Sequence, residues 1–326
     1  MPALEAAVQK TRETLQVYWE LVRIIVPVTI ATEVMARTGL IEAASPALAP
    51  VMGLFGLPPE LGLAWLTGML VGIWGAIPMI FTLVPAASMS VADITVFSAL
   101  LLFAHALPIE QKIIQKAGPG FAVTTLLRVA GGILYAMLLH HLFAATGWLS
   151  ETLDSTWIPI AASADWAGFL TGLVEALVFM LVILIALAWG LEILKLSGLM
   201  ALLMKILTPS LRLAGIKGEA EQFTAIGLFL GISYGGGLLI REARAGHVSP
   251  RQVFISCVFM GFAHSIIEDT LVVMALGADG ISVFAGRIAF AIVATALVAS
   301  LVRSIPDESF YRWAFRRAEQ PAAAGR

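Results

Sequence analysis

Apolar residues run along this chain in long continuous stretches and do not alternate with polar residues. A membrane-spanning helix needs about 20 mostly apolar residues, whereas a transmembrane β-strand alternates apolar and polar positions over about 10 residues. The pattern therefore predicts an all-α, polytopic membrane protein and excludes a transmembrane barrel. The predicted spans are 19–36, 61–84, 93–114, 119–148, 166–194, 221–241, 251–277 and 280–303.

Two shorter apolar pieces, 39–55 and 198–214, each follow a longer predicted span. If both cross, the chain has ten spans, both termini lie inside, and most Lys and Arg residues fall on the inner side, as the positive-inside rule requires. The acidic segment 149–165, which has no Lys or Arg, then lies outside. Re-entrant or interfacial helices are the alternatives for both short pieces.

This arrangement divides the chain into five parts within a bacterial cytoplasmic (inner) membrane. Residues 1–16 carry charges and lack an apolar core followed by a cleavage site, so they predict a surface helix and not a signal peptide. The parts are a cytoplasmic surface helix at 1–18, a first membrane repeat at 19–148, an outer linker at 149–165, a second membrane repeat at 166–305 and a cytoplasmic tail at 306–326.

The division rests on an internal repeat with an offset of 159 positions, which matches 24–138 onto 183–297 without a gap. Apolar segments share Leu and Ala by chance, but they rarely share Glu, Pro, Gly, His and Arg in one register. The identical pairs include Glu33/Glu192, Gly39/Gly198, Pro50/Pro209, Gly56/Gly215, Gly68/Gly227, Gly72/Gly231, His105/His264, Gly118/Gly277 and Arg128/Arg287. Five spans per copy would make the copies inverted, as in many secondary transporters, and four would make them parallel.

His264, Glu268 and Asp269 form a charged group inside a predicted span. A charge there costs roughly 2.5–3.5 kcal/mol on insertion scales, so each such residue needs a reason. Because residues i and i+4 share a helix face, we expect His264 and Glu268 to lie within hydrogen-bond reach and to face the protein interior. Asp269 would point about 100° away, toward a neighbouring helix.

The first copy carries His105, Pro108 and Glu110 in the corresponding stretch, and Pro108 predicts a kink there. The two groups are interpreted either as structural His–carboxylate pairs that join helices or as a substrate, proton or cation site. Histidine titrates near neutral pH, which suits proton coupling. A divalent metal would also suit these side chains, but the HxxxE spacing is a weak motif, and no metal site or cofactor is predicted.

Interrupted helices provide a second group of candidate residues. Three consecutive glycines weaken a helix by roughly 1 kcal/mol each relative to Ala, so we expect unwound backbone that approaches His264 and Glu268. Close helix packing is the alternative, for which Gly68-xxx-Gly72 and Gly227-xxx-Gly231 are good candidates. The candidate binding residues of the two interruptions are Ser233, Tyr234, Gly235, Gly236 and Gly237 in one copy and Trp74 and Gly75 in the stretch 74–78 of the other.

Four further charges are predicted to form pairs and not to bind substrate. Arg128 and Arg287 occupy equivalent positions in the first half of a span, where they would neutralise intramembrane carboxylates or extend to the membrane surface. Glu33 and Glu192 lie at span ends, where solvent or a nearby Arg37 or Lys195 would balance them.

Composition excludes several classes of protein. The chain is 59% hydrophobic and 13% charged, with a net charge of −2, which argues against a nucleic-acid partner. Its one cysteine, Cys257, rules out a disulfide framework or a cysteine-based metal cluster within the chain. It has no GxxxxGK[ST] or HExxH motif, and the GxSxG around Ser233 lies in an apolar span, so no catalytic residue is predicted.

The combination of Gly198-Leu199, Pro209, a turn at Gly215 and a Gly-xxx-Gly helix, followed by the run 264–270, resembles the nucleoside-recognition or Gate domain. The first half repeats this pattern, so the chain resembles a fusion of two Gate copies. Similar domains occur in spore maturation proteins A and B and in the membrane part of ferrous iron transport protein B. This chain differs from the iron transporter because it has no GTPase domain.

The sequence therefore predicts an inner-membrane secondary transporter of a small polar solute, nucleoside-like or ionic, coupled to protons or ions. The site would lie between the two copies, and the partners would be that solute and the lipid bilayer, with homo-oligomerisation left open. The alternatives are a non-transporting membrane scaffold of the Gate family, a divalent-metal permease and an intramembrane enzyme.

Overall fold

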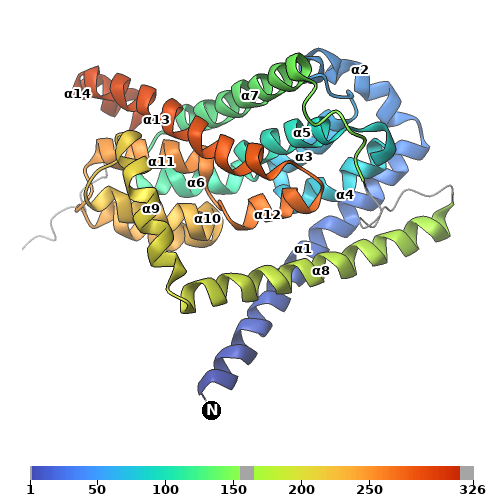
Figure 1. The fold of residues 1–326 in the computed structure, drawn as a ribbon, viewed down its shortest axis with the longest axis horizontal. Coiled ribbons are helices and arrows are strands. Elements are labelled where there is room, and N and C mark those ends of the chain that lie inside the picture. The colour runs from blue at the N-terminus through green and yellow to red at the C-terminus, as the bar shows by residue number, and fades with distance from the viewer. Residues whose placement is uncertain (1, 155–164, 316–326) are drawn as a thin grey trace, which may run out of the picture.

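The computed structural model describes residues 2–154 and 165–315, which are built of helices with no strand among them (Figure 1). Most of the predicted outer linker and the end of the predicted tail lie outside the described residues. The helices of the first half are α1 (Pro2–Arg37), α2 (Leu40–Met52), α3 (Leu61–Val71), α4 (Ile73–Leu83), α5 (Val91–Phe103), α6 (Leu107–Ala117) and α7 (Phe121–Thr146). Those of the second half are α8 (Trp166–Leu196), α9 (Leu199–Leu213), α10 (Glu219–Arg244), α11 (Pro250–Ala263), α12 (Glu268–Ala275), α13 (Arg287–Ser304) and α14 (Asp307–Ser309).

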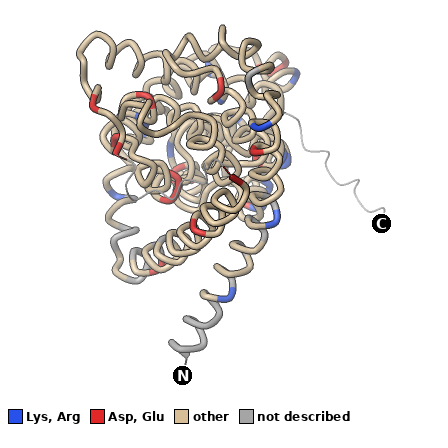
Figure 2. The backbone as a smooth tube through the Cα atoms, turned by 90° about the vertical axis from the view of Figure 1, so that its right-hand side faces the viewer, with Lys and Arg blue, Asp and Glu red and all other residues tan. Residues whose placement is uncertain are grey.

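The predicted all-α membrane protein is confirmed, because six stretches of the described residues are long and apolar enough to cross a bilayer. Figure 2 shows how sparse charged residues are along the backbone. The six stretches are Val91–Ala117, Phe121–Thr146, Trp166–Gly190, Glu219–Arg244, Pro250–Ala275 and Ile281–Ser304. The two short apolar pieces of the sequence form α2 and α9, of 13 and 15 residues. At 1.5 Å per residue neither exceeds about 23 Å, so neither can cross a hydrocarbon core of about 30 Å unaided.

The predicted span 61–84 is wrong as a continuous helix, because the chain folds back at Gly72 to form a hairpin of α3 and α4. Gly72 adopts φ 122° and ψ 173°, which only glycine adopts readily. A Cβ placed on Gly68 would lie 3.3 Å from Ala76 Cβ, whereas residues eight apart in a straight helix are separated by about 12 Å. Each arm has 11 residues and is about 16 Å long, so neither arm is long enough to cross a bilayer.

The predicted span 221–241 folds back in the same way at Gly231, although the whole of α10 is long enough to cross. Gly231 adopts φ 75° and ψ 168° inside α10. A Cβ placed on Gly235 would lie 3.1 Å from Ile226 Cγ2, a contact that a straight helix forbids for residues nine apart. Gly72 and Gly231, which were predicted to serve close helix packing, are instead the turning points of the two hairpins.

The glycines that were predicted to be unwound lie in helices. Gly235, Gly236 and Gly237 follow the turn within α10, and the stretch 74–78 lies within α4. A Cβ on Gly236 would lie 2.8 Å from Ile113 Cδ1 of α6, so this glycine permits close packing of α10 against α6. The expectation of an unwound run at 235–237 is therefore wrong, and the interruption lies four residues earlier.

Two long spans are broken near their middle. The first is interrupted between α5 and α6, where Ala106 has φ 46°, and the second between α11 and α12, where Ser265 has φ 47°. The predicted kink at Pro108 exists as a break, but it lies just before the proline, which occupies the first turn of α6. The two breaks are 159 residues apart.

Each hairpin turn meets a broken span. The amide N–H of Ala106 donates to the carbonyl oxygen of Gly68 at 2.9 Å, and that of Ser265 donates to the carbonyl oxygen of Gly227 at 3.3 Å. These hydrogen bonds satisfy backbone groups that the breaks leave free, which matters where lipid excludes water. The result is a central region in which two hairpin turns and two helix breaks lie together.

Corresponding helices of the two halves run in opposite directions. At one end of the bundle, which we call the linker end, the N–H of Val91 donates to Glu151 O at 3.0 Å and the N–H of Asp279 donates to Thr95 Oγ1 at 2.9 Å. The helix α5 begins and α7 finishes at this end, and the span that continues into α13 begins there at Ile281. The linker end thus holds the start of α5 but the finish of α12.

At the opposite end, which we call the basic end, Gly120 N–H donates to Ala314 O at 2.8 Å and Arg251 Nη2 donates to Ile305 O at 2.7 Å. The helices α7 and α11 begin here and α13 finishes here. Cationic side chains are frequent at this end: Lys112, Lys116, Arg241, Arg244, Arg251, Arg303 and Arg312.

We expect Gly231→Ala to lower the melting temperature in detergent, because a side chain disfavours this conformation by about 1–3 kcal/mol and its Cβ would lie 2.7 Å from Ser265 Oγ. Gly237→Ala is the matched control, since this helical glycine has open space around it and Ala raises helix propensity. A Gly231→Ala protein as stable as the Gly237→Ala protein would contradict the hairpin turn at Gly231.

Candidate functional site

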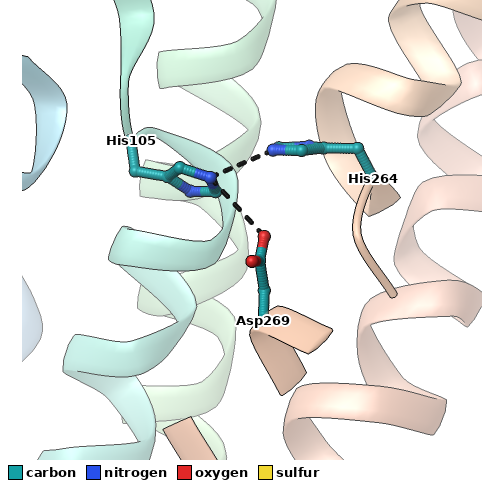
Figure 3. A group of neighbouring side chains, drawn as sticks. All are labelled: His105, His264 and Asp269. Atoms are coloured by element: carbon teal, nitrogen blue, oxygen red, sulfur yellow. Dashed lines mark hydrogen bonds and ion pairs between the residues drawn. The ribbon is translucent and has the colours of Figure 1, made fainter. Parts of the chain in front are cut away.

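Two histidines face each other at the point where the two broken spans meet (Figure 3). His105 lies two residues after the end of α5, and His264 directly follows the end of α11. Their Nε2 atoms are 3.2 Å apart and their ring centroids 4.8 Å apart. Both side chains are buried, with 7% and 1% of their surface exposed. The two histidines that the repeat pairs in sequence are therefore neighbours in space.

The arginines Arg128 of α7 and Arg287 of α13 satisfy the broken helix ends. The last carbonyl groups of a helix lack partners within it, and here they lie deep in the bundle. Arg128 Nε donates to Phe103 O at the finish of α5. Arg287 Nε donates to Phe262 O of α11 at 2.8 Å, and its Nη2 donates to Leu102 O of α5 at 2.9 Å. Arg287 thereby ties the two halves together.

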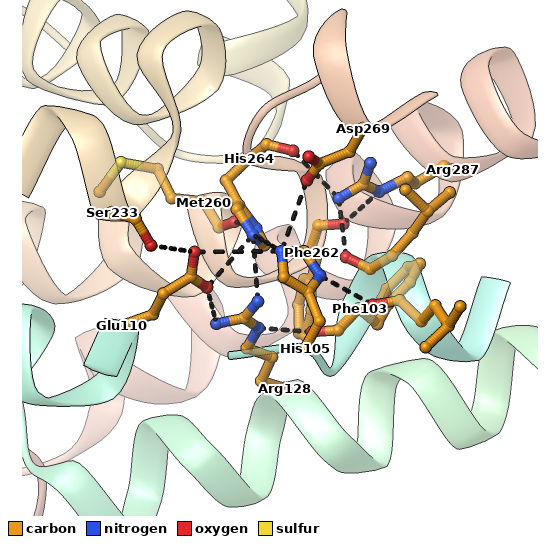
Figure 4. Close-up of polar contacts among 12 residues, drawn as sticks. Phe103, His105, Glu110, Arg128, Ser233, Met260, Phe262, His264, Asp269 and Arg287 are labelled. Carbon is orange, nitrogen blue, oxygen red and sulfur yellow. Dashed lines mark hydrogen bonds and ion pairs between the residues drawn. The ribbon is translucent and has the colours of Figure 1, made fainter. Parts of the chain in front are cut away.

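The two histidines also contact backbone oxygens near the ends of these helices, although Met260 O accepts the backbone N–H of His264 as well. His105 Nδ1 lies 2.8 Å from Leu101 O, and His264 Nδ1 lies 2.9 Å from Met260 O. In both cases the histidine lies four residues after the residue whose carbonyl oxygen its ring contacts. The arginines and histidines together contact the backbone oxygens of both broken helices, as Figure 4 shows.

Glu110 of α6 balances Arg128 and anchors one hairpin. Its Oε2 lies 2.6 Å from Arg128 Nη1 and 3.3 Å from His264 Nε2. Its Oε1 accepts a hydrogen bond of 2.9 Å from Ser233 Oγ, which lies two residues after the turn of the second hairpin. Glu110 thus links a span of the first half to the hairpin of the second.

The expected stacking of His264 on Glu268 rests on a regular helix, which the structure does not have there. The chain leaves the helix at Ala263 and resumes it at Glu268, so positions i and i+4 do not share a face. Asp269, which was expected to point elsewhere, takes that place: its Oδ2 lies 3.5 Å from His105 Nε2. His264 pairs instead with Glu110 and Arg128.

A cavity of about 130 Å³ opens beside this cluster. Gly72 and Gly231 of the hairpin turns line it, together with the broken spans. Trp74 and Tyr234 contribute aromatic rings, and Tyr234 is 62% exposed. Its remaining lining includes His105, Ala106, Glu110, Ser233, Ser265, Glu268 and Asp269.

Most of the predicted binding residues therefore converge, and a few do not. Gly75, Gly235, Gly236 and Gly237 lie in the hairpin arms and are absent from the cavity lining. The sequence analysis missed Gly72, Gly231, Ala106 and Ser265 as site residues. The signal that could have found them is the 159-residue offset, which pairs Gly72 with Gly231 and Ala106 with Ser265.

The remaining predicted charge pairs lie elsewhere. Glu33 is buried near the finish of α1, and its Oε1 lies 2.6 Å from Arg37 Nη2. The guanidinium of Arg37 also lies 4.9 Å from the ring centroid of Trp166, at the start of α8. Glu192 is half-buried on α8. These residues join long helices outside the central cluster.

His105, His264 and Asp269 bring three metal-ligating atoms within 4.8 Å of one another, and this is a group that could hold a metal ion. However, Arg128 Nη2 lies 3.0 Å from His264 Nε2 and directs an N–H at the lone pair that a metal would need. Arg128 thus occupies the nitrogen of His264 that a metal ion would need.

The fold and the site define an α-helical membrane protein whose second half is similar to a known domain family. A sequence model of the family described as "Nucleoside recognition" (Gate) matches residues 177–280, which hold the second hairpin and both pieces of the second broken span. The uncharacterized membrane protein YvoD of Bacillus subtilis (strain 168) is 26% identical over 293 residues, which cover 87% of this chain and 91% of YvoD. No solved structure matches the chain.

We expect Glu110→Gln to lower the free energy of unfolding by about 3–5 kcal/mol, because it leaves Arg128 buried without its carboxylate. The double variant Glu110→Gln/Arg128→Met should regain part of this loss. Arg212→Gln is the control, because Arg212 pairs with Glu221 at 2.8 Å but has 64% of its side chain exposed, and it should show no measurable change. Additive effects of the two central substitutions, measured by denaturation, would contradict a direct pair.

Proposed function

We propose that this protein is a secondary transporter of a small polar solute in the bacterial inner membrane. The observation that carries the proposal is the cavity at which two hairpins that do not cross the membrane meet two broken spans. Unwound backbone at membrane depth is tolerated where it lines a cavity, and transporters place substrate and ion sites at such interruptions. The carboxylates of Glu268 and Asp269, which line the cavity, also favour a binding role.

We further propose that the chain consists of two inverted Gate copies. The opposite directions of α5 and α11, and of α7 and α13, support this proposal. So do the equivalent capping bonds, since Arg128 Nε reaches the oxygen of Phe103 and Arg287 Nε that of Phe262, each 25 residues earlier. With hairpins that do not cross, and with α1 counted as a crossing, the first copy crosses through α1, α5–α6 and α7, and the second through α8, α11–α12 and α13. Three crossings per copy is an odd number, which inverts the second copy. Rocking of one copy against the other would then expose the cavity to alternate sides.

The chemistry of the cavity favours a solute that combines a polar face with a planar or apolar one. Glu268, Asp269 and the hydroxyl oxygen of Ser233 offer acceptors on one side, and Trp74 and Tyr234 offer rings on which a base or other planar group can stack. A nucleoside-like solute meets both requirements, and the description of the matched family points the same way. A small cation would use the carboxylates alone.

Uptake into proteoliposomes tests the transporter, after a thermal-shift screen of nucleosides, organic anions and metal cations has identified a ligand. A solute at 100 times its dissociation constant stabilises the fold by about 2.7 kcal/mol. We expect Trp74→Ala and Glu268→Gln to abolish uptake, while Glu308→Gln, on the exposed α14, leaves uptake unchanged. Binding without uptake by the unmodified protein would instead favour a membrane scaffold.

The topology of the proposal is testable by cysteine labelling in a Cys257→Ser background, because Cys257 is buried. Glu151→Cys at the linker end should react with a membrane-impermeant reagent added outside cells, and His247→Cys, near the basic end, should react only after the membrane is opened. The excess of Lys and Arg at the basic end sets this expectation. Outside labelling at position 247 alone would reverse the orientation.

A further inference from the structure

The hydrogen bonds of the central histidines decide which of their nitrogens carries a proton. His105 Nδ1 faces Leu101 O and His264 Nδ1 faces Met260 O, and a carbonyl oxygen can only accept. Both Nδ1 atoms therefore carry hydrogen. In a neutral imidazole with Nδ1 protonated, Nε2 is an acceptor only. Each histidine thus presents the lone pair of Nε2 to the centre of the cluster.

The lone pair of His264 already has a donor. Arg128 Nη2 lies 3.0 Å from His264 Nε2, and a guanidinium has donors and no acceptor. Arg128 is held in place by Glu110 and by Phe103 O, so it remains directed at this nitrogen. The carboxylate oxygen nearest to His264 Nε2, Glu110 Oε2 at 3.3 Å, is already paired with Arg128 Nη1 at 2.6 Å. A proton on His264 Nε2 would meet the N–H of a permanent cation. His264 is therefore kept neutral.

His105 Nε2 has no such donor. Its polar neighbours are His264 Nε2 at 3.2 Å, Asp269 Oδ2 at 3.5 Å and Glu110 Oε1 at 3.9 Å, all of which are acceptors. Asp269 Oδ2 is itself buried and accepts no hydrogen bond. His105 Nε2 and Asp269 Oδ2 are thus two buried acceptors 3.5 Å apart, and one hydrogen placed between them would satisfy both.

We propose that His105 Nε2 and Asp269 Oδ2 form a binding site for one proton, shared as an imidazolium that donates to the carboxylate. For its role as the coupling ion this inference rests on the proposed transporter. The charged groups around His105 come from every element packed against it: Glu110 of α6, Arg128 of α7, Glu268 and Asp269 of α12, and Arg287 of α13. Three carboxylates and two guanidinium groups leave one negative charge, which one proton neutralises.

The cavity provides the route for this proton. Asp269 keeps 14% of its side chain exposed, whereas His264 keeps 1%, and both Glu268 and Asp269 line the cavity. Hydronium in the cavity can deliver a proton to Asp269, which passes it to His105 over 3.5 Å. A metal ion is the less favourable occupant, because it would have to displace Arg128 from His264.

Nuclear magnetic resonance of the full-length protein with ¹⁵N-labelled histidine tests the proposal without a substrate. Five histidines give signals, and His105→Gln and His264→Gln assign the two central ones. We expect His105 Nε2 to gain a proton as the pH falls while His264 keeps its free Nε2 throughout. The proposal would be overturned if His264 gained a proton and His105 did not, or if neither histidine gained a proton over the pH range. So would Zn²⁺ shifting both signals at a pH where no proton binds.

Asp269→Asn should move the titration of His105 to lower pH by at least one unit, a tenfold loss of proton affinity, because the carboxylate that stabilises the imidazolium is gone. Asp269→Glu, which keeps the negative charge, should retain most of the proton affinity of His105. Asp307→Asn, whose carboxylate pairs with Arg251 and is 76% exposed, is the control and should change nothing. An unchanged titration in folded Asp269→Asn protein would overturn the shared site.

The outcomes separate this proposal from the transporter itself. A His105 titration that depends on Asp269, in a protein that takes up no solute, would support the proton site and remove the transport function. Solute uptake that ignores a pH gradient, in a protein whose His105 does not titrate, would overturn the proton site and leave the transporter in place.

Discussion

Carbonyl oxygens exposed by a helix break in the middle of a membrane need donors, and the centre of this protein is arranged around that need. Water cannot serve them there, so side chains must. Arg128, Arg287 and His105 supply donors at the ends of α5 and α11, and His264 Nδ1 adds a second donor to Met260 O, which also accepts the backbone N–H of His264. Two of these donors are permanent cations, so carboxylates are needed nearby to balance their charge. Glu110 balances Arg128 directly. The buried charge is thus a consequence of the broken helices.

Equivalent residues in the two halves perform unequal tasks, and this inequality gives the site its chemistry. Arg128 pairs with Glu110 through its terminal nitrogen, whereas the described bonds of Arg287 go to backbone oxygens of both halves. Asp269, the counterpart of Glu110, is left facing His105 and the cavity. One half of the cluster is closed by an ion pair, and the other faces the cavity.

The sequence analysis reached the helical class and most of the cluster, since apolar run length and the cost of intramembrane charge are local properties. It placed His105, His264, Glu110 and Asp269 together through the repeat. It failed where geometry is not periodic: it carried a regular helix through 264–268, and so paired His264 with Glu268. It also assigned the interruption to the glycine-rich run at 235–237, although the turn depends on one backbone conformation at Gly231. A glycine-rich composition indicates that a helix is weak in a region, but packing decides at which glycine the chain reverses direction.

The short arms of the hairpins constrain how the chain enters the membrane during biosynthesis. Each arm of α3 and α4 is about half as long as a bilayer is thick, so the insertion machinery cannot retain it as a span. The first arm of this hairpin also binds the break through Gly68 O, which accepts from the N–H of Ala106, a residue synthesised more than 30 residues after Gly72. The hairpin of each half therefore settles at membrane depth after the spans that follow it, and a chain truncated before α5 has no place in the bilayer for its first hairpin.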